Sequence, residues 1–268
     1  LNGSTYRFRI TPVTTQGDGQ SSIVSATPFG PASAPSLVRS TTGDGFMTVS
    51  WSAPASNGGL PIAGYQLELC TYSSCTWTSY VRNTGSPNIN TYTFSGLTNG
   101  TQYQARVSAV TGACDETLAD SSSASCSFYG AMVLGTPATV PSAPQSLTAS
   151  VATTATYGVP TASGQVTLNW AAPVTNGGQT IYGYMLEQSE NGGTSWTTVS
   201  PNLGSSSVGV PLLTTVITGL TPGTVYSYRV TPLTSEGPGA VAITSIVAPA
   251  WPTTSTVPNM VSGATVVT

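Results

Sequence analysis

The sequence of 268 residues contains no histidine and no lysine, and charged residues make up only 6% of it. Without histidine, a serine or cysteine nucleophile lacks its usual proton acceptor, and without lysine there is no amine for Schiff-base chemistry. The absence of histidine also removes the usual switch between pH 5 and 8. We therefore expect no catalytic residue, no enzymatic activity and no cofactor.

Positive charge is scarce as well, and the formal net charge is -3. The chain has no basic patch that would neutralise a run of phosphates, so it excludes nucleic acid as a partner. No run of ~18 to 20 apolar residues exists, so we expect no membrane insertion. The six arginines lie apart, at Arg7, Arg9, Arg39, Arg82, Arg106 and Arg229.

Hydrophobic residues nonetheless make up 39% of the sequence and aromatic residues 8%, which predicts a folded chain. Its surface must then consist mostly of Ser, Thr, Asn, Gln and Gly. Such a polar but nearly uncharged surface is suited to the outside of the cell. We expect an extracellular, cell-surface or secreted protein.

A long motif occurs twice and establishes an internal repeat. Trp51-Ser-Ala-Pro-Ala-Ser-Asn-Gly-Gly-Leu-Pro-Ile-Ala-Gly-Tyr65 returns as Trp170-Ala-Ala-Pro-Val-Thr-Asn-Gly-Gly-Gln-Thr-Ile-Tyr-Gly-Tyr184. The offset of 119 residues from Trp51 to Trp170 also carries Glu68 to Glu187. The register therefore holds from one strand into the next.

A second motif occurs three times, with an arginine three residues after a tyrosine at Tyr6, Tyr103 and Tyr226. Proline-rich segments before the two complete repeats mark extended linkers. We expect the C-terminal half of a repeat at residues 1–29, complete repeats at 30–138 and 139–250, and a linker with the first strand of another repeat at 251–268. Residues 1–29 would be completed by the same longer chain or by another subunit.

Apolar residues alternate along the repeats, as in Met47-Thr-Val-Ser-Trp51 and Val166-Thr-Leu-Asn-Trp170. This alternation predicts half-buried strands, and no segment shows the period of a helix. Short strands separated by Gly, Pro, Asn and Ser predict antiparallel sheets packed as sandwiches.

These motifs resemble the fibronectin type III family over nearly the whole chain, in the spelling common in bacterial secreted and surface proteins. The resemblance implies an all-β fold of tandem seven-stranded antiparallel sandwiches. It also implies a core signature of one tryptophan and two tyrosines in each repeat, with the second tyrosine forming a tyrosine corner. The signature residues are Trp51, Tyr65 and Tyr103 in the first repeat and Trp170, Tyr184 and Tyr226 in the second.

All four cysteines lie in the first complete repeat, where three pairings are formally possible. Cys70 and Cys75 face each other across one expected hairpin, and Cys114 and Cys126 across another. We favour these two disulfides, which imply an oxidising compartment. A zinc site is the alternative, but it would lack histidine, and the cysteine spacings do not match those of zinc folds.

Acidic residues supply the remaining candidate sites. Asp115, Glu116 and Asp120 cluster in a long loop, which is a candidate interaction loop; their spacing fits no established calcium loop, so we expect no metal site. Glu68 and Glu187 occupy the same repeated strand position, which we interpret as solvent-exposed, as is Glu190. The repeated Trp77 and Trp196 would pack along the sandwich edge or stack on a sugar.

The leading functional hypothesis is a non-catalytic, extracellular structural repeat of a cell-surface fibre, sheath or adhesive stalk. Its expected partners are copies of itself or neighbouring repeats, with a cell-surface polysaccharide or protein as a further candidate. The alternatives are spacer modules of a secreted polysaccharide-degrading enzyme and a segment of a phage tail or virion decoration. The same sandwich can serve each role, so fold alone does not choose between them.

Overall fold

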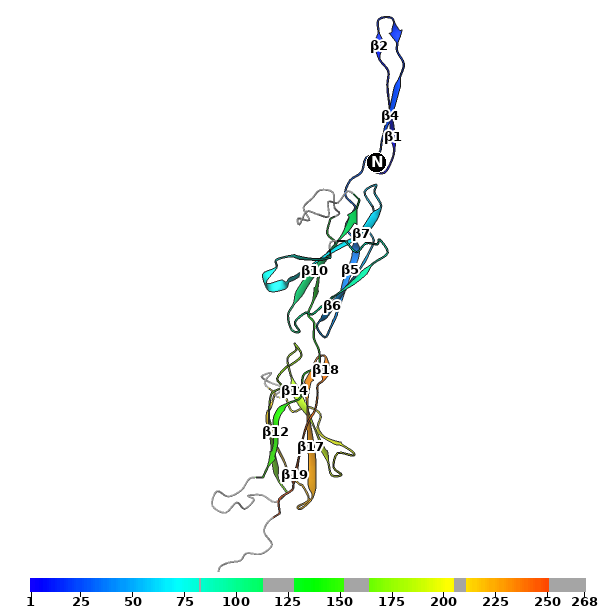
Figure 1. Ribbon diagram of the computed structural model, residues 1–268. Helices are drawn as coiled ribbons and strands as arrows, with labels where there is room; N and C mark the ends of the chain where they lie inside the picture. Colours follow the sequence, from blue (N-terminus) through cyan, green and yellow to red (C-terminus); the bar gives the residue numbers. More distant parts are fainter. Residues whose placement is uncertain (82, 113–127, 152–163, 205–210, 251–268) are drawn as a thin grey trace, which may run out of the picture. The chain divides into compact units, whose positions relative to one another are not determined.

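The computed structural model describes residues 1–81, 83–112, 128–151, 164–204 and 211–250 (Figure 1). The regular structure of these residues is β-strand, apart from one 3-10 turn at Tyr72–Ser74. Contacts divide the chain into two compact units, Leu1–Thr139 and Val140–Thr268, which we call unit 1 and unit 2. The predicted all-β fold class is confirmed.

Seven strands of unit 1 form a sandwich of two antiparallel sheets. One sheet has the strand order β5-β6-β9, and the other has the order β11-β10-β7-β8. The strands are β5 (Ser36–Gly43), β6 (Phe46–Ser52), β7 (Ile62–Thr71), β8 (Thr78–Val81), β9 (Thr91–Ser95), β10 (Tyr103–Thr111) and β11 (Val133–Gly135).

Unit 2 repeats this arrangement. One sheet has the order β12-β13-β16; in the other, β14 lies between β15 and β17, and β17 pairs with both β18 and β19. The strands are β12 (Gln145–Ser150), β13 (Val166–Ala171), β14 (Gly183–Ser189), β15 (Thr197–Ser200), β16 (Thr214–Ile217), β17 (Val225–Thr234), β18 (Gly237–Pro238) and β19 (Ala242–Val247). The expected sandwich topology is thus present in both units.

Alternation along the strands fills the space between the sheets. In β6, Met47, Val49 and Trp51 are buried, whereas the intervening residues are more exposed. The equivalent strand β13 buries residues 166, 168 and 170 in the same way. Each large apolar side chain buried here stabilises the fold by roughly 1.5 to 3 kcal/mol relative to exposure. Each unit therefore has a core of its own.

The repeated Asn-Gly-Gly motif forms the same turn in both units. The side-chain oxygen of Asn57 accepts a hydrogen bond from the N–H of Gly59 at 3.0 Å, and Asn176 accepts one from Gly178 at 3.0 Å. Gly58 has φ +69°, and a Cβ atom there would lie 2.1 Å from the carbonyl oxygen of Gly30. The glycine is therefore required for both its backbone conformation and this close approach.

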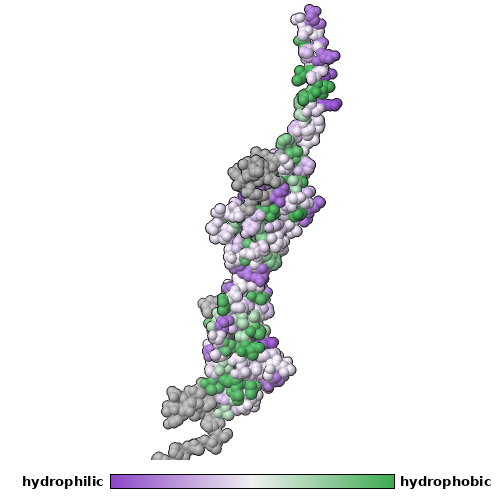
Figure 2. Space-filling view, in the orientation of Figure 1, coloured by the Kyte–Doolittle hydropathy of each residue, from purple (hydrophilic) through white to green (hydrophobic). Residues whose placement is uncertain are grey.

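Residues 1–30 of unit 1 form a separate hairpin. Strand β1 (Tyr6–Ile10) pairs antiparallel with β4 (Ser22–Ala26), and β2 (Val13–Thr14) pairs with β3 (Gly17–Asp18). Every residue of these four strands is exposed. Figure 2 shows hydrophobic surface along this hairpin. Its exposed large apolar residues include Phe8, Ile10 and Ile23.

Candidate functional site

Three tyrosines anchor the start of equivalent strands through the same contact. The hydroxyl of Tyr103 accepts a hydrogen bond from the backbone N–H of Thr98 at 3.1 Å, and Tyr226 accepts one from Thr221 at 3.1 Å. Tyr6 accepts one from the amino group of Leu1, which is also five residues earlier. The structure thus contains the tyrosine corner implied by the sequence, in which the strand is tied to the preceding turn.

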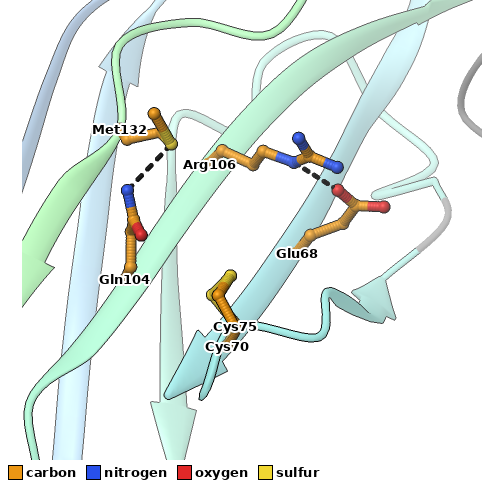
Figure 3. Close-up of a disulfide and its surroundings, with 6 residues drawn as sticks. All are labelled: Glu68, Cys70, Cys75, Gln104, Arg106 and Met132. Carbon is orange, nitrogen blue, oxygen red and sulfur yellow. Dashed lines mark hydrogen bonds and ion pairs between the residues drawn. A yellow bond between two sulfur atoms is a disulfide. The ribbon is translucent and has the colours of Figure 1, made fainter. Parts of the chain in front are cut away.

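Glu68 and Glu187 are buried, so the prediction that both are solvent-exposed is wrong. Strand register places Glu68 of β7 directly opposite Arg106 of β10, with 2.5 Å between Oε2 and Nε (Figure 3). In unit 2, Glu187 of β14 lies opposite Arg229 of β17 and accepts hydrogen bonds from Nε and from Nη2, the latter at 2.7 Å. Each carboxylate is therefore buried as one half of an ion pair.

Both arginines are also covered by aromatic rings. The guanidinium carbon of Arg106 lies 4.1 Å from the ring centre of Trp77 and 3.8 Å from that of Tyr129. In unit 2, that of Arg229 lies 4.7 Å from the ring centre of Trp196. Cations at such distances from an aromatic face are attracted to it. We call each Glu-Arg-Trp set a clasp: Glu68, Arg106 and Trp77 in unit 1, and Glu187, Arg229 and Trp196 in unit 2.

The clasps explain the repeated tryptophans. Trp77 and Trp196 are half-buried against arginine, which supports the packing interpretation over the sugar-stacking one. The hydrogen bonds that Arg229 donates to Glu187 raise the pKa of Arg229 above its ordinary value, so the guanidinium stays charged. By contrast, Glu190 is exposed, as expected.

The core signature residues lie within the sandwiches, except that Tyr103 is half-buried. Trp51 meets Tyr65 edge-on with ring centres 5.2 Å apart, and Trp170 meets Tyr184 with 5.5 Å between them. Burial raises the pKa of Tyr65 and of Tyr184 above the ordinary value for a phenol. The rings of these side chains pack against one another in the cores.

A disulfide joins Cys70 at the end of β7 to Cys75, with an S–S distance of 2.04 Å (Figure 3). This is one of the two pairings favoured from the sequence. Cys70 is two residues from Glu68 on the same strand, so the cross-link lies beside the clasp of unit 1. On the neighbouring strand, the amide of Gln104 contacts the sulfur of Met132 at 2.8 Å. Cys114 and Cys126 lie outside the described residues.

The candidate interaction loop with Asp115, Glu116 and Asp120 also lies outside the described residues, so its role stays a prediction. Within the described part of the chain, no three His, Cys, Asp or Glu side chains come together in a way that could hold a metal ion. The described carboxylates of Glu68 and Glu187 are paired with arginine, which suits them to packing and not to proton transfer.

A shallow groove of about 640 Å³ lies on unit 2, beside the Asn-Gly-Gly turn. Its lining includes Val174, which is 84% exposed, together with Ile181 and Leu213. Among the described residues that line it, Tyr184 alone is titratable, and burial raises its hydroxyl pKa. The described lining therefore offers apolar contact, with no carboxylate, arginine or cysteine side chain.

The pairing of glutamate with arginine was missed from the sequence, although a signal exists. Glutamate follows a tyrosine by three residues in β7 and β14, and arginine follows a tyrosine by three residues in β10 and β17. The antiparallel register of these strands then places each glutamate opposite an arginine.

Together, the two sandwiches and their clasps define a tandem β-sandwich protein of the immunoglobulin-like architecture, in which rare charges serve packing. The chain belongs to the fibronectin type III family, whose domain model matches residues 33–125 and 142–246. Among solved structures, it is similar to the chicken CNTN1 FN1–FN3 domains, with 18% identity and a TM-score of 0.36. That match covers 93% of this chain and 79% of the other.

Fibronectin type III domains are typically non-catalytic structural modules of extracellular proteins, and the tandem is a structural or extracellular module of this kind. Among the described residues, no helix has the length and apolar character required to cross a membrane.

Proposed function

We propose that this tandem is a non-catalytic, extracellular structural repeat that belongs to a cell-surface fibre, sheath or adhesive stalk. The observation that carries the proposal is the clasp, which recurs at the same place in both units. A feature repeated in successive sandwiches serves each module in the same way, as expected of a spacer or fibre unit and not of a single active site.

The clasps also bear on how copies would pack. Among the described residues, two arginines and two glutamates are paired inside the modules, out of six arginines and nine acidic residues in the whole sequence. The remaining surface charge is sparse, so neighbouring copies repel each other little over long range. Side-by-side or end-to-end association with copies or neighbouring repeats is therefore favoured, with a cell-surface polysaccharide or protein as the alternative partner.

Negative-stain electron microscopy of the full-length protein, purified from its source, tests this proposal. The expected result is regular fibres, sheaths or stalks, labelled along their length by antibodies raised against residues 30–250. Antibody binding to intact, unpermeabilised cells is expected as well. Dispersed particles that carry a larger globular head would contradict the fibre proposal and favour a spacer of a secreted enzyme.

A further inference from the structure

The two clasps differ in how many aromatic rings cover the arginine. In unit 1, the guanidinium carbon of Arg106 lies 4.1 Å from the ring centre of Trp77 and 3.8 Å from that of Tyr129. Among the described residues of unit 2, Trp196 alone lies over Arg229, at 4.7 Å. The side chain of Arg229 is accordingly more exposed, at 30% against 21% for Arg106. One side of the guanidinium in unit 2 thus lacks the aromatic cover that its equivalent has in unit 1.

The missing ring is explained by the chain that leads into the last strand of each unit. Val133 of β11 and Thr244 of β19 are equivalent, because each pairs with the residue two positions after the tyrosine of the corner. Four residues before Val133 is Tyr129, whereas four residues before Thr244 is Ala240. Alanine has no ring to place on the arginine, so unit 2 does not supply this second cover itself.

Strand order places the uncovered side of Arg229 toward β19. Trp196 directly precedes β15, and the order β15-β14-β17 brings its ring over the arginine from the side of β14. On the other side, β19 places Ile243 directly opposite Arg229. Ile243 is 60% exposed. The side of the arginine that lacks a ring is therefore bordered by an exposed apolar side chain.

The same face of the sheet has a second apolar pair. Side chains alternate along β17, and its buried tyrosines point into the core, so Val225 and Arg229 both point outward. Val225 pairs with Val247 of β19, and both valines are more than half exposed. The equivalent positions in unit 1 hold Gln102 and Thr136. Unit 2 is therefore apolar where unit 1 is polar, and exposed apolar groups gathered on one face mark an interaction surface.

We call this surface the β17–β19 face, and it consists of Trp196, Val225, Arg229, Ile243 and Val247.

We propose that the β17–β19 face binds an extended segment of another protein, which places an aromatic ring on Arg229 and an apolar side chain on Val225 and Val247. The ring would take the place that Tyr129 has in unit 1. Arg229 donates hydrogen bonds from its edge to Glu187, which leaves the flat face of the guanidinium for the ring. A cation is attracted to an aromatic face, so the arginine favours this class of side chain.

The spacing of the two contacts specifies the segment further. Arg229 and Val225 are four residues apart on one strand, which corresponds to roughly 13 Å. Residues i and i+4 of an extended segment lie the same distance apart and point to the same side. The segment is therefore expected to have an aromatic and an apolar residue separated by three others.

The same face of a second copy is a poorer occupant. The ring on that face is Trp196, which is already half-buried against the arginine of its own unit. Two such faces would therefore bring together arginines without a further ring to place between them. The inference concerns this face alone and does not depend on whether the tandem belongs to a fibre.

The hairpin of residues 1–30 has a counterpart in unit 2 and supplies a control. An offset of 220 carries β1 and β4 onto β17 and β19 in the same cross-strand register. The turns agree as well, because the hydroxyl of Thr14 donates to the carbonyl of Gly17 at 2.8 Å and that of Thr234 to Gly237 at 3.2 Å. Within the described residues, β1 and β4 pair only with each other, so this hairpin has no equivalent of β15 and its tryptophan.

The test uses the intact 268-residue chain and a synthetic, uncharged peptide, acetyl-Ser-Tyr-Ser-Thr-Ser-Val-Ser-amide. An NMR titration follows the side-chain Nε–Hε signals of Arg229 and Arg106 and gives the dissociation constant. We expect a saturable shift of the Arg229 signal with a dissociation constant of about 1 mM or below. The Arg106 signal should not respond, because rings already cover this arginine on two sides.

Ile243→Ser should weaken binding about fivefold, because it removes the apolar side chain beside the ring. The matched control is Ile23→Ser, since Ile23 lies opposite Arg9 in the first hairpin and is also 60% exposed. This control should leave the dissociation constant unchanged. Replacing the tyrosine of the peptide by leucine should also weaken binding about fivefold, because apolar contact is kept and the aromatic face is lost.

Three results would overturn the inference. The first is no saturable shift of the Arg229 signal up to about 10 mM peptide. The second is an equal loss for Ile243→Ser and Ile23→Ser, or equal affinity of the leucine peptide, which would reduce the effect to unspecific apolar contact. The third is concentration-dependent self-association of the chain in sedimentation that Ile243→Ser abolishes, which would make a second copy the occupant of the β17–β19 face.

Discussion

The hairpin of residues 1–30 and its counterpart in unit 2 share sequence pattern, register and turn, but not burial. Tyr6 is 40% exposed where Tyr226 is 3% exposed, and Phe8 is 53% exposed where Tyr228 is fully buried. The turn, the tyrosine corner and the strand pairing are thus encoded locally. Burial and the clasp depend on strands from elsewhere in the sandwich, namely β14 and the facing sheet.

The largest expected difference between the two hairpins lies in their aromatic residues. Tyr228→Ala should lower the free energy of unfolding of unit 2 by about 4 kcal/mol, because it removes a fully buried ring. Phe8→Ala at the equivalent exposed position should change the stability of either unit by less than about 0.5 kcal/mol. Denaturant unfolding measures both stability changes when hydrogen exchange of peptides from each unit is used as the readout. Similar losses for the two variants would show that the first hairpin is packed.

Replacement of Arg229 and of Arg9 should differ in its effect on stability by nearly as much. Arg229→Met leaves the buried carboxylate of Glu187 without its partner and should destabilise unit 2 by about 3 kcal/mol. Arg9→Met leaves no buried carboxylate without a partner among the described residues, so it should change the free energy of unfolding very little. The double variant Glu187→Gln with Arg229→Met should recover part of the loss. A neutral Arg229→Met would contradict the role given to the clasp.

Removal of the disulfide should lower the stability of unit 1 and leave that of unit 2 unchanged. Replacing Cys70 and Cys75 by serine should lower the stability of unit 1 by about 2 kcal/mol, since a short loop is no longer closed in the unfolded chain. Unit 2 has no cysteine and should unfold at the same denaturant concentration as before. Equal shifts in both units would indicate that they unfold as one.

The hydrogen bonds of the tyrosine corners should contribute less to stability than the disulfide does. Tyr226→Phe removes the hydrogen bond from Thr221 and should cost unit 2 about 1 kcal/mol, and Tyr103→Phe should cost unit 1 the same. Tyr6→Phe should leave both units unchanged, because β1 is not part of either sandwich core. Thermal unfolding of the three variants measures these differences. A loss of stability confined to Tyr6→Phe would contradict the prediction.

The stability of unit 2 should not depend on the ionisation of Tyr228 near neutral pH, but it should fall increasingly above pH 10. Burial raises the pKa of Tyr228 to about 12, above the ordinary value of 10.0. The folded state thus favours the protonated phenol, and this stabilisation is complete below pH 10 and lost as the pH rises toward 12. Unfolding midpoints of unit 2 should stay level from pH 8 to about pH 10 and fall from there to pH 12, and Tyr228→Phe should flatten that fall. A decline already present below pH 9 would point to another group.

Much of the fold could be predicted because its signals are local. The alternation in Met47, Val49 and Trp51 specified a strand with one buried face, and the Asn-Gly-Gly motif specified a turn. The five-residue contact of each tyrosine corner and the short span between Cys70 and Cys75 depend on neighbours in sequence.

The burial of Glu68 and Glu187 could not be predicted from that alternation. Both point to the outer face of a sheet, which the pattern alone assigns to solvent. What covers Glu68 is an arginine 38 residues away, itself covered by Trp77 and Tyr129 from two other segments. The burial of Glu68 results from tertiary packing, so it cannot be predicted from the alternation of residues along one strand.

The most direct test is native-state hydrogen exchange of the intact chain, comparing backbone amides of residues 5–11 with those of residues 225–231. We predict that the second set is protected to the level of global unfolding of unit 2. The first set, with one open edge and no core, should exchange at least about a hundredfold faster. Equal protection of the two sets would contradict the claim that burial and pairing with β14 stabilise β17 in a way that pairing with β4 alone, among the described residues, does not stabilise β1.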